Sequence, residues 1–106
     1  MAEVLTNIEE LRSRIDGVDD QLLHLLNVRV ACAVEVGRLK HEAGLPVYQP
    51  EREAQVLNKV RTAATGLGGP LTAEAVVRIF ERIIDEARRA ERASGHGDGA
   101  SSSIRE

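Results

Sequence analysis

The sequence predicts an all-helical protein, and three observations support this class. Aromatic residues are rare, with one Tyr, one Phe and no Trp in 106 residues, so the core has to be built from Leu, Ile, Val and Ala. The many Glu, Arg and Lys residues favour helices over strands. Three segments repeat apolar residues at spacings of three and four, which is the pattern of one helix face. The length allows one domain, which we expect to occupy residues 1–93.

The first segment is predicted to form one long helix over about residues 7–41. Asn7 is a candidate N-cap, because Glu10 follows three residues later as in a capping box. Gly44 and Pro46 end the segment. Such a helix is about 50 Å long. It is too long to fold back on its own small domain, so it needs a partner along its length.

Two shorter helices are expected after the first. Pro50 suits the first turn of a helix over about residues 50–64, and a glycine-rich break follows it. Thr72 is a candidate N-cap for a third helix over about residues 73–93. Beyond it the chain is rich in Gly and Ser. We expect residues 94–106 to be a disordered tail because they have nothing to bury.

Composition excludes several classes of protein. The net charge of −3 argues against a nucleic-acid binder, which is usually basic. Cys32 is the single cysteine, so an internal disulfide and a multi-cysteine zinc site are excluded, and its helical position predicts a small buried residue. No apolar stretch approaches the roughly 20 residues that cross a bilayer, and no secretory signal is visible. We therefore expect a cytoplasmic protein that binds neither membranes nor nucleic acid.

Cations interrupt the apolar face of the first helix. Arg12, Arg29 and Lys40 share a row with apolar residues, in steps of four and three. A buried charge is costly unless it is paired, and Asp19 is the only acid on this row. Acids off the row are poor candidates for neutralising all three cations. A bound anion is therefore one interpretation, and structural salt bridges or side chains that reach solvent from an interface are the other.

The spacing restricts which of these cations can share a pocket. Arg29 and Lys40 are 11 residues apart, about 16 Å of helix rise, so their long side chains can reach opposite ends of one small dianion. Arg12 is 17 residues from Arg29, about 25 Å along the helix. If Arg12 contributes to the same pocket, it comes from a second subunit. Long helices paired antiparallel in a two-fold dimer would provide it and would create two equal sites.

Six short runs follow one another in a specific order along the chain. They are residues 8–19 (IEELRSRIDGVD), 22–29 (LLHLLNVR), 34–40 (VEVGRLK), 44–47 (GLPV), 50–53 (PERE) and 79–87 (IFERIIDEA). In this order and spacing they resemble the all-helical chorismate mutases, and the resemblance covers about residues 7–92.

The resemblance implies a three-helix protomer, with one long N-terminal helix, in an intertwined homodimer with shared active sites. The reaction it implies is the rearrangement of chorismate to prephenate, an isomerase step of the shikimate pathway towards Phe and Tyr. This pericyclic reaction needs no metal and no cofactor. Some small members of the family dock on the enzyme that begins the shikimate pathway, which makes that enzyme a candidate partner.

The resemblance also implies roles for individual residues. Arg12 from the partner subunit and Arg29 match the family's carboxylate-binding arginines, a role that suits the arginine fork. Lys40 matches the lysine that contacts the ether oxygen, where negative charge grows as the C–O bond breaks. Arg52 matches a further arginine of the pocket. Glu53 matches the acid that accepts a hydrogen bond from the ring hydroxyl.

Three positions of the substrate site depart from the best-known bacterial pattern. Gln49 replaces an aspartate, Ala87 replaces a serine, and Glu91 replaces a glutamine that donates to the ether oxygen. A glutamate can take over that donation only when it is protonated, and fungal members are similar in having a glutamate here. Glu91 lies on an inward row with Phe80 and Ile84. The alternative is that it is a surface acid at the end of the helix.

Two other functions remain as alternatives. Isochorismate-pyruvate lyases share the fold and much of the cationic pocket, but the loop at residues 44–47 and the pair Arg52 and Glu53 look more like a mutase. A non-catalytic helical dimerisation module explains the long amphipathic helix, yet it gives no reason for cations on the face meant for burial.

Overall fold

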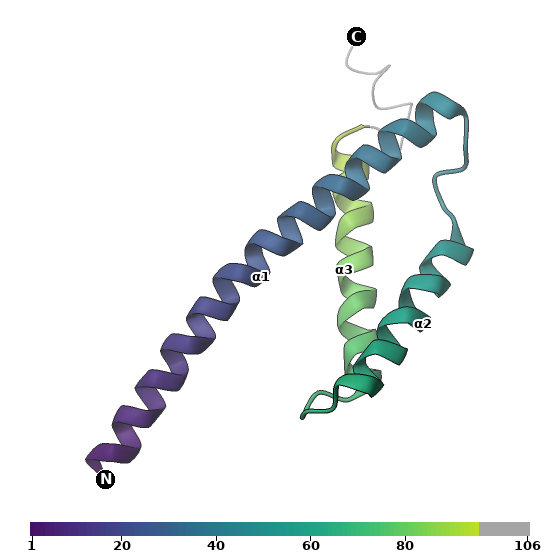
Figure 1. Cartoon of the computed structure of the whole chain (residues 1–106). Helices are drawn as coiled ribbons and strands as arrows, with labels where there is room; N and C mark the ends of the chain where they lie inside the picture. Colours follow the sequence, from purple (N-terminus) through teal and green to yellow (C-terminus); the bar gives the residue numbers. More distant parts are fainter. Residues whose placement is uncertain (96–106) are drawn as a thin grey trace.

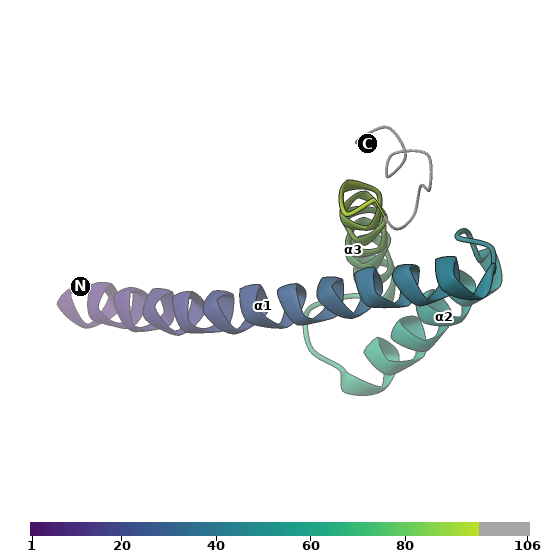
Figure 2. The same cartoon turned by 90° about the horizontal axis from the view of Figure 1, so that it is seen from above.

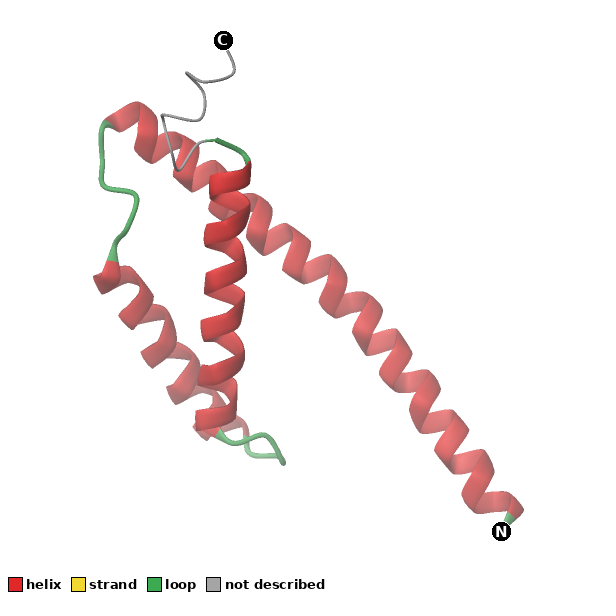
Figure 3. Cartoon of the chain, turned by 180° about the vertical axis from the view of Figure 1, so that it is seen from behind, coloured by secondary structure: helices red, strands yellow, loops and turns green. Residues whose placement is uncertain are grey.

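Three α-helices joined by two short loops form the computed structural model, which describes residues 1–95. α1 spans Ala2–Ala43, α2 spans Pro50–Leu67 and α3 spans Ala73–Ala93. No strand occurs in this part of the chain (Figure 3). The predicted all-helical class is confirmed. Of the tail expected over residues 94–106, all but the first two residues lie outside the described range.

The long helix α1 dominates the shape of the protomer. Its C-terminal half crosses α3, whereas its N-terminal half extends away from the other two helices (Figures 1 and 2). The longest dimension is 64 Å, close to the roughly 63 Å expected for a 42-residue helix. The radius of gyration is 18.7 Å, against about 13 Å for a compact chain of this size. As expected, α1 does not fold back on its own domain.

The predicted start of the first helix was wrong. α1 begins at Ala2, five residues before Asn7, and it ends at Ala43, two residues after the predicted end. Asn7 is therefore an interior residue and not the N-cap. Residues 2–6 contain no Gly or Pro that would stop a helix, and the Thr6 hydroxyl donates to the Ala2 carbonyl at 3.0 Å inside the first turns.

The helix ends that shape the site follow ordinary rules. Gly44 closes α1 in the left-handed region, with φ 70° and ψ 24°, a conformation that glycine adopts without strain. The next amide, Leu45 N–H, donates to the Lys40 carbonyl at 2.9 Å. Pro50 opens α2 as predicted. The Thr72 hydroxyl accepts from the Ala75 amide at 3.1 Å, which confirms it as the N-cap of α3.

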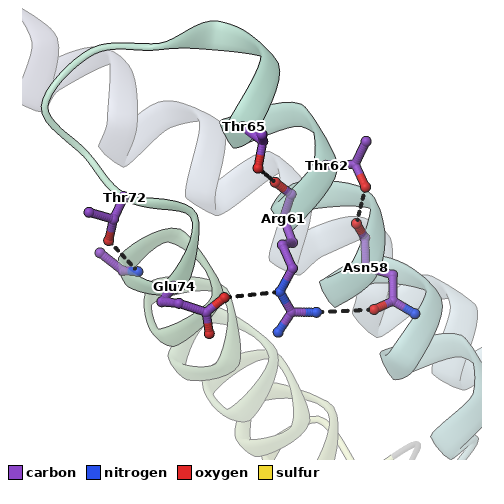
Figure 4. Close-up of polar contacts among 7 residues, drawn as sticks. Asn58, Arg61, Thr62, Thr65, Thr72 and Glu74 are labelled. Carbon is purple, nitrogen blue, oxygen red and sulfur yellow. Dashed lines mark hydrogen bonds and ion pairs between the residues drawn. The ribbon is translucent and has the colours of Figure 1, made fainter.

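Helices α2 and α3 form a hairpin that is tied together near its turn (Figure 4). Arg61 of α2 donates to Glu74 of α3 at 3.2 Å and to Asn58 at 3.2 Å. α2 runs three residues past the predicted end at residue 64. The Thr65 hydroxyl donates to the Arg61 carbonyl at 3.0 Å within the last turns, and Gly66 does not end the helix.

The protomer buries very little apolar surface by itself. Val77 and Ala87, both on α3, are the only buried hydrophobic residues in the described range. By contrast, the large apolar residues that recur at spacings of one, three and four between Val4 and Leu25 of α1 are 38% to 61% exposed. These are Val4, Leu5, Ile8, Leu11, Ile15, Val18, Leu22 and Leu25. A continuous exposed apolar stripe of this kind marks an interaction surface. Within residues 1–95, no helix is both long and apolar enough to span a bilayer.

Candidate active site

A pocket of about 510 Å³ lies where the three helices and the loop at residues 45–49 meet. Its volume is in the range of small-molecule sites. It brings together seven of the eight residues predicted to bind substrate, and these come from all three helices and from the loop between α1 and α2. They are Arg29, Lys40, Gln49, Arg52, Glu53, Ala87 and Glu91.

The side chains that line the pocket give it a positive charge. Five cations line it, against two carboxylates, so its net charge is +3 when both acids are ionised. The cations are Arg29, Lys40, Arg52, Arg88 and Arg92, and the acids are Glu53 and Glu91. A concave site with this excess of one sign attracts a small anion with two negative groups.

Two cations of α1 are held by neighbouring parts of the chain. The Arg29 guanidinium lies over the Phe80 ring of α3, 6.0 Å from its centroid, in a cation–π contact. The Lys40 ammonium donates to the Val47 carbonyl at 2.9 Å. Lys40 therefore ties the loop at residues 45–49 to the last turns of α1. Both side chains are partly buried and remain part of the pocket lining.

The start of α2 presents three neighbouring residues to the pocket. The Gln49 carbonyl accepts from the Arg52 amide at 3.1 Å and from the Glu53 amide at 3.3 Å. These bonds fix the first turn of α2. The Gln49 side chain makes no cap hydrogen bond, so it lines the pocket without serving the helix end.

Glu53 has a cationic partner on α3. Arg88 donates to Glu53 and also to Asp85, one turn earlier on its own helix. The Arg88 and Glu53 side chains are 35% and 28% exposed. The hydrogen bond to Asp85 is the largest cause that raises the pKa of Arg88, and the bond to Glu53 raises it further. The Arg88 guanidinium therefore stays charged. This pair joins α2 to α3 at the pocket and fixes where the Glu53 carboxylate lies.

Glu91 is the acid of α3 that points towards α1. Burial raises the pKa of its carboxyl, while the charges of Lys40, Arg88 and Arg92 lower it and that of Glu53 raises it. The net direction is upward. Glu91 is partly buried and lines the pocket, which argues against its interpretation as a surface acid. Ala87, one turn earlier, is 5% exposed and offers no hydroxyl to a ligand.

Arg12 is the predicted site residue that lies outside the pocket. Its side chain is 70% exposed and pairs with Glu9 at 3.2 Å. Glu9 is off the row but three positions away, which makes it a neighbour of Arg12 on the helix surface, so one of the three cations has an acidic partner. An exposed pair of this kind adds little stability, so Arg12 remains available to another ligand.

The family model for chorismate mutase type II matches residues 11–92. The chain belongs to this family. It is 38% identical over 81 residues to the bifunctional chorismate mutase/prephenate dehydratase of Aquifex aeolicus (76% of this chain, 22% of that protein). It is 37% identical over 92 residues to the T-protein of Enterobacter agglomerans (87% of this chain, 24% of that protein).

A shorter relative is the chorismate mutase of Methanocaldococcus jannaschii, 31% identical over 58 residues (55% of this chain, 59% of that protein). The chain thus spans less than a quarter of the length of the first two relatives. No solved structure matches with significance.

Sequence reasoning missed nine residues that line the pocket of this chorismate mutase family member, and four of them have ionisable side chains. These four are Cys32, Tyr48, Arg88 and Arg92. Arg88 could have been found, because it lies four residues after Ile84 and three before Glu91, and therefore shares their face of α3. Cys32 was expected to be buried. It is exposed and lies in the wall of the pocket.

Proposed function

We propose that the chain catalyses the rearrangement of chorismate to prephenate. The observation that carries this proposal is the cationic pocket. In a chain of the chorismate mutase type II family, it gathers Arg29, Lys40, Arg52, Glu53 and Glu91 around a volume suited to one small dianion. Chorismate carries two carboxylates and a ring hydroxyl, which match this set of cations and acids in charge.

The proposed reaction asks for positioning and charge stabilisation only. Within one chorismate molecule, the ether C–O bond breaks while a new C–C bond forms, so no group, proton or electron leaves or enters. Arg29 binds one carboxylate and holds the reactive conformer. Lys40 stabilises the negative charge that grows on the ether oxygen, as preorganised donors do elsewhere. Arg52 adds a further positive charge, and Glu53 accepts a hydrogen bond from the ring hydroxyl.

The second subunit in this proposal is another copy of the chain, paired through the exposed apolar stripe of α1. Two α1 helices can be set antiparallel in a register where the numbers of two facing residues, one from each chain, add to 41. In this register Leu11 of one chain faces Val30 of the other, and Ile15 faces Leu26. Both pairs are apolar. The same register sets Arg12 opposite Arg29. Two like charges at this level repel each other unless an anion lies near them. We therefore place one substrate carboxylate at this point of the proposed dimer.

Glu91 is expected to act as the neutral acid, which produces a specific pH dependence. An ionised carboxylate would repel the charge growing on the ether oxygen, so kcat/KM should fall as pH rises through the Glu91 ionisation. The raised pKa moves this fall to higher pH than for an ordinary carboxyl. Glu91→Gln donates at every pH, so it should flatten this limb. Profiles for both proteins between about pH 5 and 8 test this, and identical profiles would remove Glu91 from the chemistry.

Arg88 is expected to act on substrate binding through Glu53. Arg88→Met removes the partner that fixes the Glu53 carboxylate, so its hydrogen bond to the ring hydroxyl weakens. We expect KM for chorismate to rise about fivefold, the equivalent of one hydrogen bond of about 1 kcal/mol, with a smaller change in kcat. Arg89→Met is the matched control, because Arg89 is the next residue on α3 and does not line the pocket. An equal rise of KM in both variants would contradict a role for Arg88.

The direct test of the proposed function is an assay of chorismate consumption and prephenate formation by the purified chain. A parallel incubation with isochorismate separates the mutase from a lyase, because the lyase would release salicylate and pyruvate. Thermal unfolding with a chorismate-like dicarboxylate adds a readout that needs no turnover. A dimerisation module without a ligand site would show no upward shift in Tm.

A further inference from the structure

Gly37 is the only buried residue of α1. A Cβ atom built at Gly37 would lie 3.0 Å from Oε2 of Glu91, 3.4 Å from its Cδ and 3.5 Å from its Cγ. The whole end of the Glu91 side chain therefore packs against the bare backbone of α1 at this point. A side chain at position 37 would contact the carboxyl group so closely that the carboxyl would have to shift by a few tenths of an ångström.

Glycine at this position is not explained by the backbone. Gly37 has no positive φ, unlike Gly44 at the end of α1, so any residue could adopt its conformation. Glycine in a helix interior costs about 0.5–1 kcal/mol relative to alanine. Gly17, also in α1, has no atom near the place of its missing Cβ. Close approach of Glu91 is thus the feature that distinguishes Gly37.

We propose that Gly37 is a positioning residue: its missing side chain sets where the Glu91 carboxyl lies in the pocket. The packing of Glu91 against Gly37 is enough to argue that Gly37 sets the position of the carboxyl. The expected effect on catalysis rests in addition on the proposed function. The charged groups that share the pocket with this carboxyl are Arg29 and Lys40 on α1, Arg52 and Glu53 on α2, and Arg88 and Arg92 on α3. A displaced carboxyl would change its distance to Lys40 and to the ether oxygen of the substrate.

Gly37→Ala is expected to lower activity without unfolding the chain. Alanine favours the helix, but its methyl group makes the Glu91 carboxyl move away from the α1 backbone by a few tenths of an ångström. We expect kcat to fall about tenfold, because small displacements of a reacting group are costly. Less burial also lowers the pKa of Glu91, so the fall of kcat/KM at high pH should begin at lower pH than in the wild type.

Two comparisons separate positioning from a general structural effect. Gly66→Ala is the matched control, because Gly66 is also helical and has open space around it, and it should keep wild-type kcat and pH profile. In a Glu91→Ala background, Gly37→Ala should change kcat by less than about twofold, since no carboxyl is left to displace. An equal loss in both backgrounds would overturn the proposal.

A third measurement does not depend on turnover. The Glu91 carboxyl carbon, followed by NMR during a pH titration, should titrate at lower pH in Gly37→Ala than in the wild type, and an unchanged titration would overturn the proposal.

If the alanine variant does not fold, nuclear Overhauser contacts in the wild type between the Gly37 α-protons and the Glu91 γ-protons decide the question, and their absence overturns it. If the wild type does not convert chorismate, the proposed function fails, whereas the titration still decides the role of Gly37.

Discussion

Replacement of Lys40 by alanine is expected to lower kcat by about a hundredfold or more, with a smaller rise in KM. The reason is that the ether oxygen of chorismate gains negative charge only as the C–O bond breaks, so the Lys40 charge stabilises the transition state more than the bound substrate. Loss of one preorganised donor to a developing anion costs about 3 kcal/mol. Steady-state kinetics with chorismate measure both constants.

Lys40 also holds the loop at residues 45–49, and this second role needs a control. Its ammonium donates to the Val47 carbonyl at 2.9 Å, so alanine at position 40 would also loosen the loop. Lys40→Gln keeps a donor that can reach towards Val47 but removes the charge. A low kcat in both variants assigns the effect to the charge. Wild-type kcat in Lys40→Gln, or an unchanged kcat in Lys40→Ala, would show that Lys40 serves the loop only.

The three helices, and the shared face of Arg29 and Lys40, were predictable from sequence because both depend on periodic spacing within one segment. The other residues of the candidate site were predicted through the resemblance to the family. Apolar steps of three and four gave the three helices, and α3 has the predicted bounds. The same periodicity put Arg29 and Lys40 on one face of α1, and both line the pocket. The start of α1 was less predictable. A capping pattern at Asn7 is a weak local preference, and the favourable continuation of the helix through residues 2–6 outweighs it.

Contacts between helices were not predictable in the same way. The pair of Arg88 and Glu53 joins residues 35 positions apart, and no spacing rule relates α2 to α3. Gly37 likewise has meaning only once α1 crosses α3 and the Glu91 carboxyl reaches its backbone. In both cases the sequence contains the residues, but their roles depend on how the helices cross.

Arg12 connects the protomer to the proposed dimer. In the single chain its partner is Glu9, both side chains are at least 70% exposed, and the nearby apolar stripe is half exposed. An antiparallel second copy would cover that stripe and bring Arg12 of one chain to the pocket of the other. The proposed site is therefore complete only in the dimer, and this can be tested by mixing two inactive variants.

Arg12→Ala and Arg29→Ala are each expected to be almost inactive as homodimers, since every site then lacks one carboxylate-binding arginine. In a mixed dimer, the pocket of the Arg12→Ala chain keeps its own Arg29 and receives an intact Arg12 from the other chain, whereas the second pocket lacks both. Random re-association of equal amounts makes half of the dimers mixed, so activity should recover to about a quarter of the wild-type value. The variants are unfolded and refolded together, and mixed dimers are isolated with two different affinity tags. If isolated mixed dimers stay as inactive as their parents, Arg12 does not act across the interface.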